Sequence, residues 1–332
     1  MTVENQENAN HSLQPSAGQL SSSVRPTNSN LLDNLNRGRT MPYLIVHGKF
    51  VIKGKSPDGD TVSFRPNNQE HWLKLTGKRV PRMNRNGDVN IRFEAIDALE
   101  THYRGKGWLP EYHQPLNFAN QARDFMLRSI GIDPEEVEWD GKRVLTAPDE
   151  TEGYIATNGV DPWNRVIAFV FHGEPISHDG DDKFYLYPDH VKKSVNFALA
   201  NEGFIYPTFY SALYPSLRYL ISEACIEARE ERKGLWPHDV SISGVTIPDP
   251  KNLSPITDEH CIFPKLFRRL VTHLSQNGQI KNFHGFLYDE SDLAIRIDNC
   301  EMATLRRFVG INNDEDRVYL KIPPEKLLFV PE

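Results

Sequence analysis

The segment N-I-R-F-E-A-I-D-A-L-E-T, residues 90–101, holds three side chains with complementary chemistry close together in the chain. Arg92 can hold a phosphate through paired hydrogen bonds, and Asp97 can bind a hard cation through its oxygens. Glu100 can orient or deprotonate a water molecule. Brought to one point, these residue types would suit the hydrolysis of a phosphate ester.

One strand and one turn must position these groups. In residues 91–95 apolar side chains alternate with Arg92 and Glu94, which is the period of two that is typical of a β-strand. A straight strand rises about 3.3 Å per residue, so Arg92 and Asp97 would lie roughly 16 Å apart. We therefore predict a strongly coiled strand, as in a small β-barrel, or an arginine that reaches back to the turn carrying Asp97 and Glu100.

Three further motifs lie beside predicted strands or helices. The turn D-G-D-T, residues 58–61, precedes an alternating strand, and D-P-W-N-R, residues 161–165, introduces the apolar strand R-V-I-A-F-V-F. K-G-L-W, residues 233–236, follows a predicted helix, and we interpret it as structural. Each motif alone also has an ordinary explanation, with Asp60 as the cap of a turn and Arg165 as a surface charge.

Taken in this order, the four motifs resemble the staphylococcal nuclease (thermonuclease-like) family over about residues 43–237. The resemblance implies an α+β fold, a five-stranded OB-fold β-barrel with three helices. It implies a calcium-dependent nuclease that hydrolyses phosphodiester bonds of DNA and RNA and leaves 3′-phosphate ends. The implied calcium ligands are the carboxylates of Asp60 and Asp97 and the backbone carbonyl of Ala98.

The resemblance also implies catalytic roles for three residues. Glu100 positions or deprotonates the attacking water, and Arg92 and Arg165 bind the phosphate. These residue types fit the reaction, because guanidinium groups keep their charge and match phosphate oxygens in pairs. The chain departs from the family at Ala98-Leu99, where the family has Thr-Pro, and loss of that proline is expected to loosen the loop that holds Glu100.

Residues for binding nucleic acid follow from charge and aromatic character. The connection between His71 and Gly87 contains no acidic residue, and its basic side chains include Lys74, Lys78, Arg79, Arg82 and Arg85. Trp163, Tyr206 and Tyr210 are candidates for stacking on bases. The ordinary alternatives are a solvated hairpin for the basic residues and core packing for the aromatic ones.

Composition bounds the remaining possibilities. The net charge of -7 among 332 residues gives no overall basic footprint, so nucleic-acid binding has to rest on local charge. The three cysteines are far apart without a CxxC spacing, which argues against a disulfide framework and a zinc site. With no visible signal peptide and no apolar run of about 20 residues, we expect a cytoplasmic protein and no membrane partner.

Three segments are predicted along the chain: a disordered polar tail (1–40), the nuclease-like domain (41–240) and a C-terminal α+β accessory domain (241–332). In the middle segment, helical spacing predicts helices near 118–130, 191–199 and 217–228, and the run 137–144 predicts a strand. In the last, we predict a helix over 263–274, a short helix before Gly310, and strands at 283–288, 293–298 and 318–322.

Two functions from different classes remain open at this point. The first is the calcium-dependent nuclease, with the C-terminal domain serving assembly, targeting or control, including a possible homo-oligomer through its apolar helix. The alternative is a catalytically weak OB-fold scaffold that binds nucleic acid or protein. The presence of Asp60, Arg92, Asp97, Glu100 and Arg165 together favours the nuclease.

Overall fold

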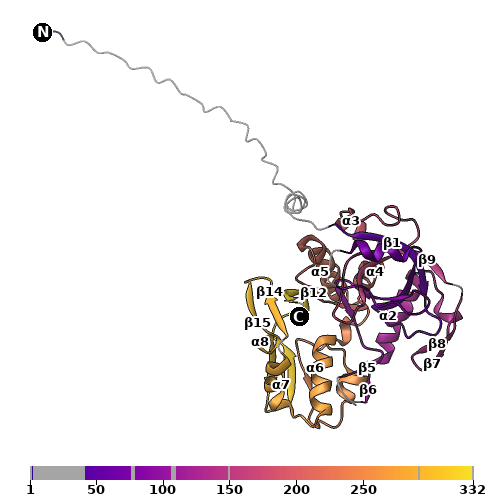
Figure 1. The fold of residues 1–332 in the computed structure, drawn as a ribbon. Coiled ribbons are helices and arrows are strands. Elements are labelled where there is room, and N and C mark those ends of the chain that lie inside the picture. The colour runs from indigo at the N-terminus through magenta and orange to yellow at the C-terminus, as the bar shows by residue number, and fades with distance from the viewer. Residues whose placement is uncertain are drawn as a thin grey trace. The chain divides into compact units, whose positions relative to one another are not determined.

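The computed structural model describes Thr2 and residues 42–75, 79–105, 110–148, 150–290 and 292–330. The predicted disordered tail, apart from Thr2, and Lys78 lie outside the described residues. Residues Thr40–Glu332 form one compact unit (Figure 1). The segment that the sequence marks as a C-terminal accessory domain therefore belongs to the same compact unit as the predicted nuclease-like domain.

This unit contains a closed five-stranded barrel. The strands follow one another around it in the order β1 (Leu44–Val51), β2 (Thr61–Pro66), β3 (Val89–Phe93), β10 (Val166–His172) and β9 (Thr151–Val160). All neighbours are antiparallel except β3 and β10, which are parallel. The five-stranded barrel of an α+β fold is thus confirmed, and its strand order is consistent with an OB-fold.

Large apolar side chains fill the barrel. Phe50 and Phe64 face each other from β1 and β2 with ring centroids 5.4 Å apart, and both are fully buried. The barrel can close this tightly because Gly48 pairs with Gly153 across β1 and β9. A Cβ atom on Gly48 would lie 2.1 Å from the carbonyl oxygen of Arg65, which no side chain could tolerate.

A sharp bend follows β3 and directs the chain back along the barrel. Ala95 adopts a left-handed conformation with φ of 71°, and the next residues form β4 (Ile96–Ala98). β4 pairs with β11 (Ile205–Pro207), which places Tyr206 opposite Asp97. The prediction that Asp97 lies in a turn is therefore wrong: the turn is completed at Ala95, and Asp97 lies on a short, fully buried strand.

Four α-helices lie before residue 240 in the part of the chain that the structure describes, one between barrel strands β3 and β9 and three after β10. They are α2 (Leu116–Ser129), α3 (Pro188–Val191), α4 (Val195–Asn201) and α5 (Pro215–Glu230). Three of them match the predicted helices, and α3 is an additional single turn. The predicted strand at 137–144 is a hairpin of β7 (Glu138–Asp140) and β8 (Arg143–Thr146), because Gly141 turns the chain with φ of 57°.

Short elements connect these larger ones. The 3₁₀ turns are η1 (Gln69–Lys74), η2 (Pro134–Glu136) and η3 (Trp236–His238). Two-residue strands form a small hairpin after Glu100, with β5 (Tyr103–Arg104) paired to β6 (Glu111–Tyr112). A further short strand, β12 (Phe209–Tyr210), precedes α5.

The C-terminal part begins with β13 (Val245–Thr246) and contains two small sheets and three helices among its described residues. Its elements are, in order, η4 (Pro255–Glu259), α6 (Pro264–Ser275), η5 (Ile280–Asn282), α7 (Phe283–Glu290), β14 (Leu293–Arg296), β15 (Glu301–Thr304), α8 (Leu305–Phe308), β16 (Val309–Asn312), β17 (Arg317–Leu320), η6 (Pro324–Lys326) and β18 (Leu327–Phe329). The predicted helix at 263–274 and the short helix before Gly310 correspond to α6 and α8.

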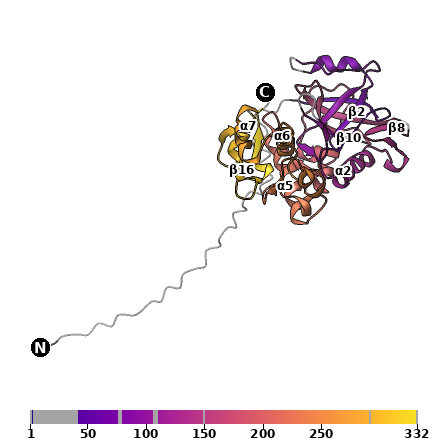
Figure 2. The ribbon, with the colours of Figure 1, turned by 90° about the horizontal axis from the view of Figure 1, so that it is seen from below.

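One prediction in this part is wrong. Residues 283–288 form helix α7 instead of a strand. Helix α7 lies beside α6 (Figure 2). The rings of Phe283 and Phe286 recur at helical spacing and both lie against His273 of α6, with centroids 5.5 and 5.1 Å away. The sequence of a short apolar run is compatible with either a strand or a helix, and here packing against α6 favours the helix.

The C-terminal part is joined to the barrel part through backbone and side chains. β18 pairs in parallel with β12, so Phe209 and Leu328 are register partners. Arg229 of α5 makes a two-pronged ion pair with Glu325, with N–O distances of 2.7 and 2.9 Å. Because the sheet of β12, β18, β14 and β15 draws strands from both parts, the C-terminal residues complete the fold.

The bend after β3 creates a pH-dependent contribution to stability. Burial raises the pKa of Glu94 from the ordinary 4.5 to about 7, although the Ala95 N–H donates to its carboxylate. The folded protein therefore keeps this proton between those values while the unfolded chain loses it, so stability falls as pH rises from 4.5 to 7. Glu94→Gln keeps the acceptor and removes the ionisation.

We expect Glu94→Gln to be more stable than the wild type at pH 8, by up to about 3 kcal/mol, and close to it near pH 4.5. Urea unfolding at both pH values measures the difference. Glu152→Gln, at an exposed position on β9, should change stability by less than about 0.5 kcal/mol at either pH. A Glu94→Gln effect of the same size at both pH values would contradict the assignment.

Candidate functional site

Arg92 brings two distant carboxylates together. Thr61 at the start of β2 is the register partner of Arg92 on β3, which places the preceding residue, Asp60, beside the arginine. Arg92 Nη1 lies 2.6 Å from Asp60 Oδ2, and Nη2 lies 2.8 Å from Asp97 Oδ1. The guanidinium of Arg92 thus reaches back across the bend, as one of the two sequence-based alternatives required.

Backbone contacts fix Asp60 in this position. Its Oδ2 accepts a hydrogen bond from the Ala98 N–H at 2.7 Å, and its Oδ1 accepts one from the Thr61 hydroxyl at 3.1 Å. The turn before it packs closely, since a Cβ atom on Gly59 would lie 2.7 Å from the Cβ of Ala98. The structure therefore brings Ala98 to the site through its N–H, whereas its carbonyl as a calcium ligand remains a prediction.

A second arginine, which the sequence did not indicate, enters the site from the C-terminal part. Arg268 of α6 binds both oxygens of Asp97, with Nη1 3.2 Å from Oδ1 and Nη2 2.7 Å from Oδ2. The same Nη1 donates to Glu100 Oε1. Asp97 is held between Arg92 and Arg268, and Arg268 links it to Glu100.

The loop that carries Glu100 is anchored by a buried side chain. The Glu100 N–H donates to Gln114 Oε1 at 3.3 Å, and the Gln114 N–H donates to the Glu100 carbonyl at 2.9 Å. Gln114 Nε2 donates in turn to the carbonyl of Ile262 at 2.7 Å, just before α6. These bonds hold the loop where the family resemblance would place a proline.

The charges around this point do not balance. The charges of Asp60 and Glu100 act on Asp58, and those of Asp60 and Asp97 act on Glu100. With all four carboxylates ionised, four negative charges face the two positive charges of Arg92 and Arg268, while Lys265, which also acts on Asp97, is paired with Asp292. Asp58 Oδ1 is buried without a hydrogen-bond partner among the described residues. We call the four acidic residues together with Arg92 and Arg268 the carboxylate cluster.

The pKa shifts reflect this imbalance. Burial, followed by the charges of Asp60 and Glu100, raises the pKa of Asp58 well above its ordinary value. Burial also raises the pKa of Glu100, although Arg268 opposes that change. For Asp97 burial acts in the same sense, but the adjacent charges of Arg268 and Arg92 outweigh it and lower the pKa. The surplus negative charge favours a proton on Asp58 or a bound cation.

Arg165 lies directly before the neighbouring strand β10 and outside these contacts. Its successor Val166 pairs with Ile91, so Arg165 precedes the strand that lies beside the one carrying Arg92. The Arg165 Nε lies 2.7 Å from Asp161 Oδ2, and Asp161 Oδ1 accepts from the backbone N–H groups of Trp163 and Arg165 at 2.9 Å. Asp161 thus holds Arg165 in the turn before β10, which we call the rim of the site.

The predicted nucleic-acid-binding residues divide into exposed and buried ones. Trp163 is 72% exposed, and Arg79 and Arg82 are exposed on the basic connection. The Arg82 N–H donates to the Asn164 carbonyl at 3.0 Å, which ties this connection to the turn that carries Trp163. Lys74 donates its ammonium to the Gly180 carbonyl at 2.7 Å.

Tyr206 and Tyr210 are less accessible than Trp163 for stacking on a base. Tyr206 is fully buried, its hydroxyl donates to Asp239 at 2.8 Å, and its ring packs edge-on against Trp236. The prediction that Tyr206 stacks on a base is therefore wrong, because β11 lies inside the fold. Tyr210 is half-buried and packs against Phe329.

A ready-made metal centre is not formed by the side chains. Within the described residues, no group of three or more His, Cys, Asp and Glu side chains is arranged to hold a metal ion. In the carboxylate cluster the guanidinium groups of Arg92 and Arg268 lie between the carboxylates that would converge on a cation. The oxygen donors suit calcium, but two arginines already bind them.

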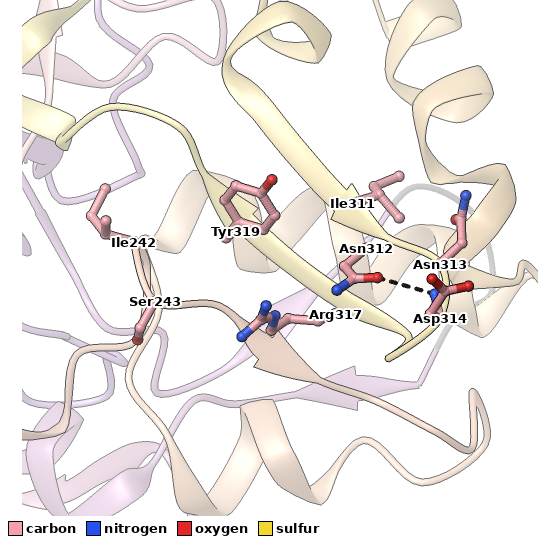
Figure 3. A pocket seen from close by; sticks show the side chains of 8 residues that line it. All are labelled: Ile242, Ser243, Ile311, Asn312, Asn313, Asp314, Arg317 and Tyr319. Atoms are coloured by element: carbon pink, nitrogen blue, oxygen red, sulfur yellow. Dashed lines mark hydrogen bonds between the residues drawn. The ribbon is translucent and has the colours of Figure 1, made fainter.

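A separate hollow of about 520 Å³ lies in the C-terminal part (Figure 3). Its lining residues are Ile242, Ser243, Ile311, Asn312, Asn313, Asp314, Arg317 and Tyr319. Arg317 pairs with Glu315, and Asp314 uses its backbone N–H to bond Asn312. None of the predicted site residues lines this hollow, so it adds nothing to the chemistry of the carboxylate cluster.

Comparison with known proteins does not identify the chain. A scan against protein-family models finds no match, and a search of curated proteins finds none either. No helix among the described residues is long and apolar enough to cross a membrane. The assignment of function therefore rests on the geometry of the carboxylate cluster and on the motifs of the sequence.

Asp161 offers a direct test of how the rim is built. Asp161→Ala removes the buried acceptor of two backbone N–H groups and the partner of Arg165, so we expect a loss of about 2 kcal/mol in the free energy of unfolding. Asp189→Ala, at an exposed i,i+3 pair with Lys192, should cost less than about 0.5 kcal/mol. Urea denaturation measures both, and equal values would show that Asp161 does not hold the turn.

Proposed function

We propose that this protein is a divalent-cation-dependent nuclease that hydrolyses phosphodiester bonds of DNA and RNA. The observation that supports this proposal most directly is the double contact of Arg92 with Asp60 and Asp97. It gathers, beside strand β3 of the closed five-stranded barrel, the residue types that the sequence motifs assign to phosphate binding and metal binding. Glu100 joins them through Arg268.

The carboxylate cluster has the donor chemistry for calcium. Asp60, Asp97 and the Ala98 carbonyl would supply hard oxygens, and the orphaned Asp58 Oδ1 with the surplus negative charge gives a cation something to neutralise. A bound calcium ion would polarise the phosphate and help to order the attacking water. Calcium suits a site with few protein ligands better than magnesium, which demands stricter octahedral geometry.

Side chains of the protein would activate the water and bind the phosphate. Burial raises the pKa of Glu100, which makes this carboxylate a stronger base toward a nearby water. Asp60 and Asp97 outweigh the effect of burial on Arg92 and raise its pKa, so the guanidinium stays charged for the equatorial phosphate oxygens. Arg165, at the rim beside the exposed Trp163, would add a second guanidinium when it turns from Asp161.

The exposed side chains of the basic connection and of the turn that carries Trp163 indicate the class of substrate. Exposed Arg79, Arg82 and Trp163 provide charge and one stacking surface, which suit a sugar-phosphate backbone and an unpaired base. Nothing in this set distinguishes deoxyribose from ribose, so we propose a sugar-non-specific activity. That it leaves 3′-phosphate ends is implied by the family resemblance alone.

Replacement of the proposed base tests the mechanism. Glu100→Gln keeps the shape of the side chain but removes its charge, so turnover should fall at least a hundredfold while oligonucleotide binding persists. Arg165→Ala should reduce turnover through lost stabilisation of the transition state. Glu70→Gln, at an exposed position on η1, is the matched control and should cleave as the wild type does.

These rates are measured on plasmid DNA and on RNA with calcium, with magnesium alone and with chelator. We expect cleavage in calcium, weaker cleavage in magnesium and none with chelator. Undiminished cleavage after chelation would remove the metal from the proposal. Wild-type rates in Glu100→Gln would remove this residue from the catalytic group.

The basic connection should follow the phosphate backbone. Neutralising Arg79, Arg82 and Arg85, all of them exposed, should weaken binding of every sequence and reduce the slope of log affinity against log salt by about two to three. Binding of an oligonucleotide duplex in chelator, followed by fluorescence anisotropy, measures the slope without cleavage. Arg306, Arg307 and Lys321 changed to glutamine give a control of equal charge change, and equal slopes in both triple variants would favour a solvated hairpin.

One contact supports the alternative function, a catalytically weak scaffold. Arg268 occupies Asp97 and Glu100, the groups that catalysis would need free. A scaffold would bind nucleic acid equally well with calcium or chelator and would cleave under neither condition. Binding and cleavage measured with calcium and with chelator therefore distinguish the scaffold from the nuclease.

A further inference from the structure

We propose that Arg268 is a built-in counter-cation of the carboxylate cluster, and that a divalent cation must displace its guanidinium from Asp97 and Glu100. The C-terminal helix α6 thereby closes the site in the absence of metal. This inference rests on the proposed function only for the nature of the displacing ion. It concerns cation binding and is tested without measuring cleavage.

The contacts of Arg268 are those of a bound cation. Its two terminal nitrogens take both oxygens of Asp97 and one oxygen of Glu100. Arg92 Nη2 also binds Asp97 Oδ1. An ionised carboxylate has about four lone-pair positions, so three of those on Asp97 are already used. A divalent cation approaching Asp97 would also meet two guanidinium charges of the same sign.

Arg268 is the more exchangeable of the two arginines. Its side chain retains 24% of its exposure, whereas Arg92 retains 16% and extends from strand β3 of the barrel. Withdrawal of Arg268 would let its guanidinium hydrate without altering a barrel strand. Arg92 cannot leave without uncovering both Asp60 and Asp97.

The position of α6 makes the Arg268 contact part of the fold. Phe267 packs its ring against Tyr103 with centroids 6.3 Å apart, and the Tyr103 hydroxyl bonds the hydroxyl of Thr272 at 3.2 Å. The hydroxyls of Ser275 and Tyr112 lie 2.9 Å apart. α6 thus lies on the small hairpin that follows Glu100, and Arg268 is held over the cluster from that base.

The neighbouring Arg269 provides a matched control on the same helix. It forms ion pairs with Asp292 and Glu290, at 2.6 and 2.9 Å, within the C-terminal part. Arg269→Gln removes the same charge from α6 and weakens the packing of the helix without touching Asp97. A merely structural role for Arg268 would therefore be reproduced by this variant.

Isothermal titration with calcium, on the full metal-free chain, tests the inference. We expect Arg268→Gln to bind calcium at least tenfold more tightly than the wild type. Arg269→Gln should bind within threefold of the wild type. Arg268→Lys keeps the charge but loses the two-pronged geometry, so we expect an intermediate tightening of about threefold to fivefold.

Thermal melting supplies a second measurement and checks that the variants fold. In chelator, Arg268→Gln should melt below the wild type, because Asp97 and Glu100 lose their counter-cation. Added calcium should raise its melting temperature more than that of the wild type. If Arg268→Gln does not fold in chelator, calcium-dependent folding supports the inference, and Arg268→Lys carries the affinity measurement.

Calcium affinity in Arg268→Gln that is equal to or weaker than in the wild type would overturn the proposal, as would the absence of calcium binding in every variant. Equal tightening in Arg269→Gln would also overturn it. Tighter binding in Arg268→Gln without cleavage by any variant supports the inference and contradicts the nuclease. Calcium-dependent cleavage with equal affinities in wild type and Arg268→Gln contradicts the inference and leaves the nuclease standing.

Discussion

The ion pairs of Arg92 with Asp60 and Asp97 are the interaction on which the rest of the site depends. Burying either carboxylate without a cation would cost several kcal/mol, so the guanidinium is what allows both to lie inside the fold. The pairing needs the register of β2 with β3 and the left-handed turn at Ala95. A non-glycine residue with positive φ carries local strain, and here it directs Asp97 back toward Arg92.

The same electrostatics explains why the C-terminal part is integral to the molecule. Arg92 alone cannot neutralise Asp58, Asp60, Asp97 and Glu100, and Arg268 supplies a second positive charge from α6. Sheet pairing of β12 with β18 and the bond from Gln114 to Ile262 fix the chain around that contact. The apolar side of α6 is consequently buried within one compact unit.

The pattern of neighbouring residues in the sequence predicts those strands and helices that depend mainly on local interactions. Alternation and turn residues predict the barrel strands β2, β3 and β10, and an Arg92 side chain that reaches back toward Asp97 is one of the two alternatives that the spacing leaves. The sequence does not indicate Arg268, because Arg268 and Arg269 are adjacent arginines that differ only in the direction in which their side chains leave α6. Arg268 contacts the carboxylate cluster, whereas Arg269 contacts Asp292. That direction depends on packing between residues far apart in the chain. For the same reason the apolar run at 283–288 was assigned to a strand, and Tyr206 to a binding surface.

Stability and the proposed catalysis place opposite demands on the carboxylate cluster. Four acidic groups facing one another would repel, and arginine pairing neutralises part of their charge without a metal. The proposed catalysis would require Glu100 free to act on water and Asp97 free to bind a cation, so the pairing that stabilises the fold would also limit that chemistry. Arg92 lies on a barrel strand and would keep its place with or without a metal, whereas Arg268 extends from helix α6. Under our proposal the charge of Arg268 and the charge of a metal would serve as alternatives, and the position of α6 would determine which of them the cluster holds.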